Sequence, residues 1–375
     1  MKRFYSDRVL LDHALKPAYV GVEAGKIVRV STVPFEAEAC VDCSGMILAP
    51  GFVELHCHGG MGADYGKSDP EEMKKALDFH LKHGATTQLP TVTTAPIAEM
   101  EAALERLAQV EHPAMAGVHL EGPYLSLKQS GAQDPATITA PVKQDYERLI
   151  ARFGTLIRRW SYAPERDEGN AFLKALNRAG IVAAAGHTDA LYEEMNEAAA
   201  EGCRLITHLY SCTSTVVRIN CFRHGGVLET ALLRDDVDVE LIADGCHLPP
   251  ELLQLVWKVK GPDHVALITD ALAVAGLEEK ETSVGPLRCI VEDGVCKLAD
   301  RSAFAGSIAT ADRLVRTVVR AGIPVADALV MASTTPARIL DLPKGRIAEG
   351  LDADLVVLDQ ELQLAAVYLA GEKVL

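Results

Sequence analysis

The chain has 375 residues, 49% of them hydrophobic, and carries a formal net charge of −15 at pH 7. This length suits one large domain with a smaller companion. The negative charge argues against partners such as nucleic acid or an anionic membrane, because both would be repelled. An anionic small-molecule substrate would therefore require a local cluster of positive charge.

The N-terminal segment has neither a long apolar stretch nor a small-residue cleavage site, so we expect no signal peptide. No part of the chain reaches the roughly 18 uninterrupted apolar residues of a membrane span. The nine cysteines are scattered, and their odd number favours reduced thiols over a disulfide framework. We therefore expect a soluble, cytoplasmic protein.

Eight short apolar runs recur along the chain, most of them followed by an amphipathic helical pattern. Such runs, apolar on both faces and rich in β-branched residues, are typical of buried parallel strands. Eight strand–helix units over about 280 residues match the size of a (β/α)8, or TIM, barrel. A doubly wound sheet is the alternative, but it would more often show G-x-G-x-x-G after its first strand, which is absent here. The runs cover residues 45–55, 85–91, 115–121, 158–164, 181–187, 203–208, 239–244 and 264–270.

The two ends of the chain have a different pattern. Residues 1–48 include VGVEAGKIVRVS, which predicts a β-hairpin with its turn at Ala24 and Gly25. Residues 343–375 are again alternating and rich in turn residues. We therefore predict an α/β protein in which both termini form a small β-sandwich domain. The TIM barrel, residues 49–342, would be inserted into it.

Residues that can bind a metal lie at the ends of five of the predicted strands. In a TIM barrel the active face lies at the carboxyl ends of the strands, so these side chains should converge there. Alternate residues of a strand point to the same face, so an HxH pair can grip one ion. Each residue alone has an ordinary structural explanation, but the set is hard to explain as packing. Its members are His56, His58, Glu121, His187, His208 and Asp270.

Imidazoles and carboxylates suit Zn2+, Fe2+ or another divalent ion of intermediate softness. Such an ion lowers the pKa of a bound water to about 7 and polarises a carbonyl group. Asp270 beside that water could accept its proton and pass it to a leaving amine. The residues thus favour hydrolysis of an amide or related C–N bond. Two ions are compatible with them, one on His56, His58 and Asp270, the other on His187 and His208, with Glu121 between.

The order HxH, carboxylate, His, His, Asp resembles the amidohydrolase superfamily. Many members bridge two metals with a carboxylated lysine, whereas here a glutamate stands at the end of the third strand instead. The segments HLEGPYL, GHTDA, THLY, IADGCH and ITDA are similar to those of the N-acetylglucosamine-6-phosphate deacetylase family, and the similarity covers nearly the whole chain. It implies a metal-dependent deacetylase that forms glucosamine 6-phosphate and acetate.

The resemblance also implies roles for individual residues. Glu121, His187 and His208 match the ligands of the metal site that is always occupied in the family. His56 and His58 match the HxH pair of members with a second metal, and Asp270 matches the catalytic acid and base. The cofactor would be one or two divalent ions per subunit, with Zn2+ or Fe2+ expected.

Two basic residues match the family's phosphate contacts. His247 corresponds to a histidine beside the sugar phosphate. Arg223 corresponds to an arginine that reaches the phosphate of a neighbouring subunit, which implies a homodimer, although Arg218 and His224 lie close by in the sequence and could take that role. These residues would supply the local positive charge that an acidic chain needs.

The sequence departs from the family in the expected substrate pocket. The segment GAQDP places Gln133 where the family has a histidine bonded to the acetyl carbonyl, and an amide cannot become charged. After THLY the chain reads Ser211-Cys212-Thr213-Ser214, followed by several additional residues. We expect a substrate pocket lined by Ala132, Gln133, Ser211, Cys212, Arg223, His247, Phe304, Ala305 and Gly306.

These departures leave alternatives open. The same chemistry could act on N-acetylgalactosamine 6-phosphate or on another N-acyl amine. A metal-binding relative without activity, serving as a regulator or scaffold, is disfavoured because Asp270 and the full ligand set are present. His119, two residues before Glu121 on the same strand, could also face the metal site.

Overall fold

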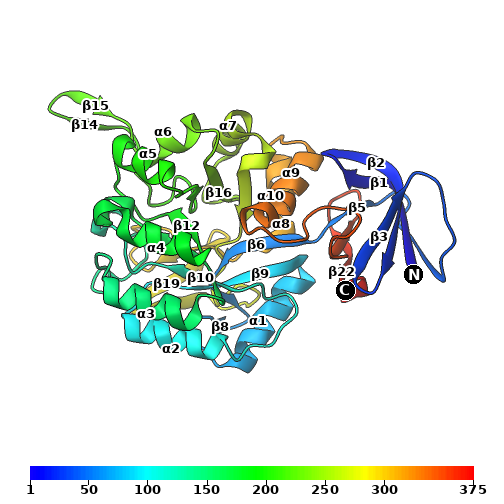
Figure 1. Ribbon diagram of the computed structural model, residues 1–375, viewed down its shortest axis with the longest axis horizontal. Coiled ribbons are helices and arrows are strands. Elements are labelled where there is room, and N and C mark those ends of the chain that lie inside the picture. The colour runs from blue at the N-terminus through cyan, green and yellow to red at the C-terminus, as the bar shows by residue number, and fades with distance from the viewer.

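Eight parallel strands form a barrel at the centre of the computed structural model, which describes all 375 residues (Figure 1). Each strand overlaps one of the eight apolar runs, extending past it by two residues at most, so the predicted TIM barrel is confirmed. The strands, in barrel order, are β6 (Phe52–Cys57), β9 (Ala85–Val92), β10 (Val118–Glu121), β11 (Ile157–Tyr162), β12 (Val182–Ala185), β13 (Leu205–Ile206), β16 (Asp238–Ile242) and β17 (Val265–Ile268).

The barrel closes where β17 meets β6. Asp270 N donates to His56 O at 2.9 Å, and His58 N donates to Ala271 O at 2.8 Å. The buried carboxylate of Glu54 adds a side-chain link, because it accepts hydrogen bonds from the backbone N–H groups of both His56 and Thr269 at 3.0 Å. The first and last strands are therefore joined immediately beside two predicted metal ligands.

Helices cover the outside of the barrel. The first of them starts with a capping box between Asp69 and Glu72 and has Pro70 at its first turn, a strong local start signal. No helix is both long and apolar enough to cross a membrane. The helices are α1 (Pro70–Lys82), α2 (Ile97–Leu107), α3 (Lys143–Phe153), α4 (Ala171–Ala179), α5 (Tyr192–Ala200), α6 (Val227–Leu233), α7 (Pro250–Lys260), α8 (Ala311–Arg320), α9 (Val325–Ala332) and α10 (Thr334–Ile339).

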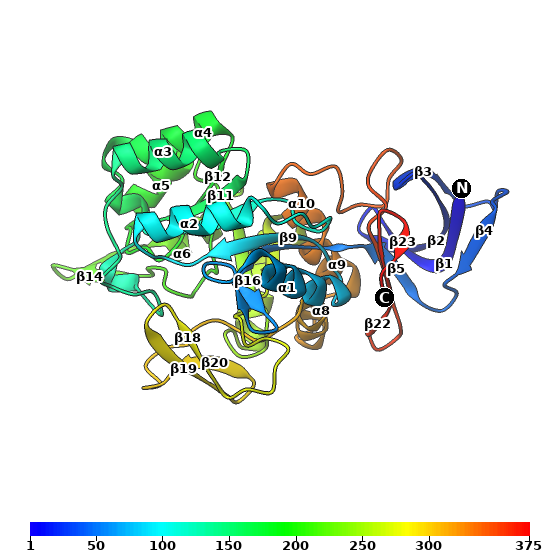
Figure 2. The same cartoon turned by 90° about the horizontal axis from the view of Figure 1, so that it is seen from below.

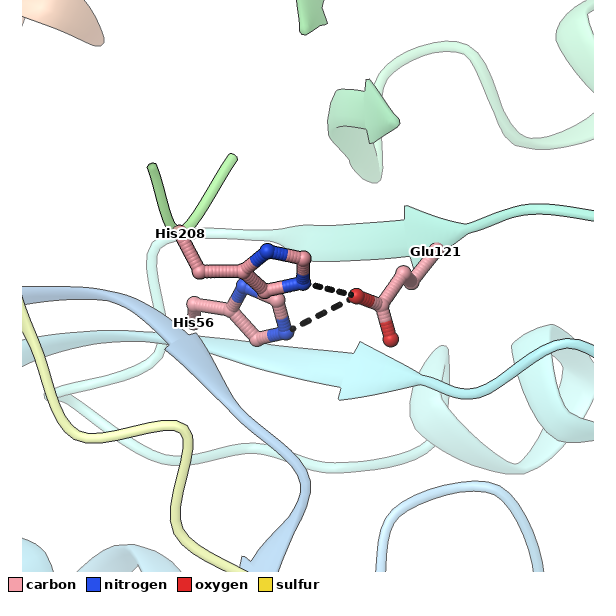
Figure 3. Close-up of side chains that lie close together, drawn as sticks. All are labelled: His56, Glu121 and His208. Atoms are coloured by element: carbon pink, nitrogen blue, oxygen red, sulfur yellow. Dashed lines mark hydrogen bonds and ion pairs between the residues drawn. The ribbon is translucent and has the colours of Figure 1, made fainter. Parts of the chain in front are cut away.

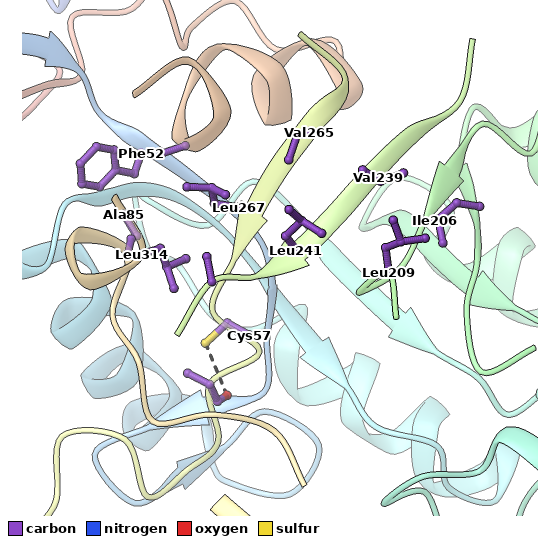
Figure 4. Close-up of a cluster of buried hydrophobic side chains, with 14 of the residues drawn as sticks. Phe52, Cys57, Ala85, Ile206, Leu209, Val239, Leu241, Val265, Leu267 and Leu314 are labelled. Atoms are coloured by element: carbon purple, nitrogen blue, oxygen red, sulfur yellow. Dashed lines mark hydrogen bonds between the residues drawn. The ribbon is translucent and has the colours of Figure 1, made fainter. Parts of the chain in front are cut away.

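Alternation along the strands separates an outer core from the barrel interior. Leu241 of β16 and Leu267 of β17 face outward and pack with Leu314 of α8 (Figure 4). Their neighbours Ile242 and Ile268 belong instead to an inner cluster, to which Ala337 of α10 and Leu340 just after it also belong. The strands thus bury both faces, as the continuous apolar runs predicted.

Both termini contribute to one sheet at the end of the molecule away from the barrel helices α3 and α4 (Figures 1 and 2). The predicted hairpin turn at Ala24 and Gly25 is present between two of its strands. The ring centroids of Phe4 and Tyr368 lie 4.9 Å apart although their strands are not neighbours, so the sheet folds over its own core. Its strands are β1 (Lys2–Leu11), β2 (Ala14–Glu23), β3 (Lys26–Ser31), β4 (Ala39–Asp42), β5 (Ile47–Pro50), β21 (Leu355–Leu358), β22 (Leu364–Leu369) and β23 (Glu372–Lys373).

The first apolar run serves two sheets. Its first half is β5, which lies between β1 and β21 in the terminal sheet, and its second half is β6 of the barrel. The change of sheet occurs at Gly51, where a Cβ would lie 2.0 Å from Thr86 Oγ1. The run was predicted as one barrel strand, because both halves are equally apolar.

Three small sheets lie outside these two bodies. The hairpin of β14 (Val217–Ile219) and β15 (Phe222–His224) projects from the barrel near α5 and α6 (Figure 1). A three-stranded sheet, β18 (Glu281–Val284), β19 (Leu287–Glu292) and β20 (Val295–Leu298), follows the last barrel strand (Figure 2). The third pairs β7 (Gly59–Gly60) with β8 (Ala63–Asp64).

We predict that Leu241→Ala lowers the free energy of unfolding by about 2–5 kcal/mol, because it leaves a cavity between β16 and the helices. Denaturant unfolding monitored by circular dichroism measures this change. Leu233→Ala is the matched control, since Leu233 is 70% exposed and its truncation should change stability by less than about 0.5 kcal/mol. Equal losses for both variants would contradict the packing described for β16.

Candidate metal centre

Three of the predicted ligands lie two residues beyond the end of their strands. His187, His208 and Asp270 follow β12, β13 and β17, and each has a positive φ, of 47°, 30° and 51°. This left-handed conformation is costly for residues other than glycine, by about 1–3 kcal/mol each, and it tends to occur at functional sites. The turns direct all three side chains into the mouth of the barrel.

The carboxylate of Glu121, the last residue of β10, lies at the centre of the group. Its Oε1 atom is 3.0 Å from His208 Nε2, 3.2 Å from His187 Nε2 and 3.5 Å from His56 Nε2. Figure 3 shows His56, on strand β6, and His208, on the loop after β13, both approaching this oxygen. One carboxylate oxygen is thus surrounded by three imidazole nitrogens.

Asp270 and His58 form the other half of the group. Asp270 Oδ1 lies 3.2 Å from His58 Nε2 and 3.4 Å from His56 Nε2. Glu121 Oε2 lies 3.4 Å from His58 Nε2, so Glu121 faces both halves, one with each oxygen. The structure therefore brings all six predicted ligand side chains into one buried cluster.

The electrostatics of the cluster follow from its burial and its mixed charges. Burial opposes ionisation of Asp270, but the charges of His56 and His58 prevail and lower the pKa of Asp270 to about 2. Burial also opposes protonation of His58, but hydrogen bonds to Asp270 and Glu121 raise the pKa of His58 to about 10. The carboxylates are thus ionised and attract positive charge to their centre.

The side chains present fit a divalent metal. Two groups of three ligand atoms each lie within 4.8 Å of one another, one from His56, Glu121 and His208, the other from His56, His58 and Asp270. His56 Nε2 and His58 Nε2 face each other at 3.1 Å, so a cation between these lone pairs would satisfy both. Imidazole nitrogens and carboxylate oxygens suit zinc and similar ions.

Most of the ligand histidines are held through their other ring nitrogen. His58 Nδ1 lies 2.8 Å from Thr93 Oγ1. His187 Nδ1 lies 2.8 Å from the backbone oxygen of Gln129, and His208 Nδ1 lies 3.0 Å from that of Ser211. Such bonds fix the ring and leave Nε2 free to bind a metal.

A cavity of about 280 Å³ opens above this cluster. Some residues that line the cavity were not predicted. They are Thr93, Tyr210 and an apolar group of Ile242, Leu272 and Val284. Val284 belongs to the three-stranded sheet after β17. The predicted residues that line the cavity are His58, Glu121, Ala132, Gln133, His187, His208, Ser211, Cys212, His247, Asp270, Phe304, Ala305 and Gly306.

Two predicted site residues do not line this cavity. His56 is fully buried beneath it and contacts only the other ligands and the barrel interior. Arg223 is exposed on the projecting hairpin β14–β15, directly opposite Arg218 in the register. Arg223 is therefore remote from the metal cluster of its own chain.

Gln133 has a definite place in the structure. Its Nε2 donates to Glu121 Oε2 at 2.7 Å, and its Oε1 accepts from Thr94 N at 3.2 Å. The amide therefore holds the central carboxylate in addition to lining the cavity.

His247 is oriented by a residue that the sequence analysis did not single out. His247 Nδ1 lies 2.9 Å from Asp244 Oδ2, and the His247 ring packs on Phe304 with centroids 4.8 Å apart. A hydrogen bond from Nδ1–H to Asp244 leaves Nε2 available to a ligand. The spacing of three residues within IADGCH was the available signal for this pair.

We predict that a divalent metal at about 100 times its Kd stabilises the folded protein by about 2.7 kcal/mol relative to chelator-treated protein. Differential scanning calorimetry with and without metal measures the rise in Tm. Glu121→Gln should abolish most of this rise, because it removes the charge at the centre of the cluster. Glu99→Gln, at an exposed position of α2, should retain it. A full rise with Glu121→Gln would contradict a metal site here.

Comparison with known proteins agrees with this geometry. The model of the amidohydrolase family matches residues 47–374. The chain is 31% identical to N-acetylglucosamine-6-phosphate deacetylase of Bos taurus, over 99% of this chain and 95% of the relative. It is 31% identical to N-acetylgalactosamine-6-phosphate deacetylase of a Shewanella species, over 88% and 83%.

Solved structures show the same likeness. The crystal structure of N-acetyl-D-glucosamine-6-phosphate deacetylase from Mycobacterium smegmatis superposes with a TM-score of 0.93 and 33% identity, covering 100% of both chains. The match includes the barrel and the terminal sheet. The chain therefore belongs to the amidohydrolase family, and within it to the N-acetylglucosamine-6-phosphate deacetylases.

Proposed function

We propose that this protein is a metal-dependent deacetylase that hydrolyses N-acetylglucosamine 6-phosphate to glucosamine 6-phosphate and acetate. The observation that carries the proposal is Asp270, an ionised carboxylate that both touches the metal cluster and lines the cavity. The names of the full-length relatives support this substrate. The Mycobacterium smegmatis enzyme has also been crystallised, as a variant, in complex with N-acetyl-D-glucosamine-6-phosphate.

The proposed metal-binding side chains divide into two sites. Glu121, His187 and His208 would hold one ion, and His56 with His58 would hold a second beside Asp270. Zn2+ or Fe2+ is the proposed ion, with one or two per subunit. When bound, the metal would activate water and polarise the acetyl carbonyl.

Asp270 would carry the proton in this reaction. Its low pKa keeps it ionised near neutral pH, so it can accept a proton from the attacking water. The same carboxyl can then donate this proton to the departing amine of the sugar. The backbone N–H of Asp270 donates to His56 O across the barrel closure, and this hydrogen bond fixes the carboxylate relative to His56.

The cavity offers different surfaces to different parts of the substrate. The acetamide would lie over the metal cluster, with Gln133 at its side. Phe304 and Leu272 provide apolar surface for the sugar ring, and His247 would meet the phosphate. Because the chain has a net charge of −15, the positive charge that the phosphate requires would have to come from a neighbouring side chain such as Arg223.

Arg223 would complete the phosphate site of a neighbouring subunit. Within its own chain it stands on a hairpin that projects away from the barrel (Figure 1). Phe222 beside it is 73% exposed, which gives the hairpin an apolar surface for contact. We therefore propose a homodimer in which each hairpin reaches the other subunit's cavity. We also propose that the protein is located in the cytoplasm.

The experiment that tests the function is an acetate-release assay on a small substrate panel. Metal-loaded protein is incubated with N-acetylglucosamine, its 6-phosphate, and N-acetylgalactosamine 6-phosphate. The proposal expects N-acetylglucosamine 6-phosphate to have the highest kcat/KM. Absence of acetate release with every divalent metal would reject the proposed activity. Preference for the unphosphorylated sugar would reject the phosphate roles of His247 and Arg223.

A second candidate substrate is N-acetylgalactosamine 6-phosphate. Two features that differ from the usual family pattern, Gln133 and the segment from Ser211 to Ser214, lie at or beside the cavity. A Shewanella relative of similar identity carries the name of the galactosamine enzyme. The same panel decides, because the two substrates differ only in the configuration of one hydroxyl group.

We predict that Asp270→Asn lowers kcat by about 10²–10⁴-fold, since an amide cannot carry the proton. Metal content, measured by atomic emission, should equal the wild-type value because Glu121 and all four histidine ligands are retained. A variant with lost activity and lost metal would assign Asp270 mainly to metal binding. Unchanged kcat would show that another group carries the proton.

We predict that Arg223→Ala lowers kcat/KM for the phosphorylated sugar by about 10–100-fold, the value of a charge-assisted hydrogen bond. Activity on the unphosphorylated sugar should change little. Arg218→Ala is the matched control on the opposite strand of the hairpin.

Mixing the subunits tests the contact between copies. Arg223→Ala and Asp270→Asn subunits, unfolded and refolded together, should regain activity, because a mixed dimer contains one site with both residues intact. No recovery in mixtures shown by mass spectrometry to contain mixed dimers would place Arg223 in its own subunit's site.

A further inference from the structure

The fourth ligand histidine differs from the other three in how its ring is held. His58, His187 and His208 each have an acceptor within 3.0 Å of Nδ1. His56 Nδ1 has no hydrogen-bond partner, although the residue is fully buried. The acceptor that faces it is Glu240 Oε2, at 3.7 Å.

Glu240 lies in β16 and points into the barrel interior, one layer below the metal cluster. Its side chain is fully buried, and its Oε2 also lies 3.4 Å from the backbone N–H of His208. The same oxygen therefore faces two residues whose Nε2 atoms approach Glu121. A carboxylate behind a ligand histidine fixes its tautomer and strengthens it as a ligand.

Arg159 of β11 holds Glu240 in this place. Its NH2 donates a hydrogen bond to Glu240 Oε2 at 2.8 Å, and its NH1 forms an ion pair with Oε1 at 2.5 Å. The guanidinium also donates to Leu55 O and to Thr207 Oγ1, both at 2.9 Å. Since β11 and β16 are not neighbours in the barrel, this contact spans the barrel interior.

We propose that Glu240, held by Arg159, is the positioning residue for His56, and that it sets the affinity of the metal site that includes His56. When Nε2 of His56 binds an ion, Nδ1 must carry the proton, and Glu240 Oε2 is the acceptor placed to receive it. The inference rests on the proposed function, because it requires a metal at this cluster.

The test compares two double variants that each remove an arginine–carboxylate pair with its carboxylate on β16, one pair fully buried and the other partly exposed. Arg159→Met/Glu240→Leu removes the pair below His56. Asp238→Leu/Arg338→Met removes a pair at the start of the same strand, where Arg338 NH2 donates to Asp238 Oδ1 at 2.7 Å. Apolar replacement of both charges avoids an unpaired buried ion and helps each variant to fold.

Metal affinity is measured by competition with a chromophoric chelator, and the Tm of the metal-free proteins is measured in parallel. We expect the Glu240 double variant to bind Zn2+ about 10–100-fold more weakly at the site that includes His56. The Asp238 double variant should bind as the wild type does, whatever its Tm. Wild-type affinity in the Glu240 variant, or equal weakening in both variants, would overturn the proposal.

If the Glu240 double variant does not fold, Arg159→Gln/Glu240→Gln decides, because it also removes both buried charges and keeps polar groups in the barrel interior. This variant nearly keeps the size of the Glu240 side chain but loses its charge, so we expect weaker metal binding at the site that includes His56. Wild-type affinity would overturn the inference. The proposed function fails separately, if the wild-type protein itself binds no metal or releases no acetate.

Discussion

The site exists because the barrel closes between β17 and β6. Backbone hydrogen bonds from Asp270 and His58 cross this seam, and the Glu54 carboxylate takes one N–H from each strand. The seam lies between the residue proposed to move the proton and the pair proposed to hold a metal. A shift of one strand along the other would separate them, so the register of the closure fixes the geometry of the chemistry.

The interior of this barrel is a polar support for the site as well as an apolar core. Below the cluster, His119 Nε2 lies 2.8 Å from Ser161 Oγ, which lies 2.7 Å from Thr207 Oγ1. Above them, three strained turns present His187, His208 and Asp270. The polar network and the surrounding strands must together hold these turns in their left-handed conformation. A substitution that weakens the barrel interior should therefore also disturb the geometry of the site.

The sequence predicted the barrel and the ligand cluster because both follow simple periodic rules. Apolar runs with metal-binding residues at their ends can be recognised without tertiary information. The sheet of β18–β20 was missed, because its short strands are polar on one face and resemble loops. Glu54 and Glu240 were missed as well, because the partner of a charge inside a strand depends on which strands face each other. The contact of Gln133 with Glu121 and the remoteness of Arg223 likewise depend on loop placement.

The terminal sheet has a consequence for how the chain folds during synthesis. β5 lies between β1 and β21, and β21 leaves the ribosome only after the whole barrel. Until then the edge of β5 is open, and the core around Phe4 lacks Tyr368. An open apolar edge invites pairing with other chains. The early strands must therefore stay free of such contacts while the barrel forms, and the barrel brings the two halves of the sheet together.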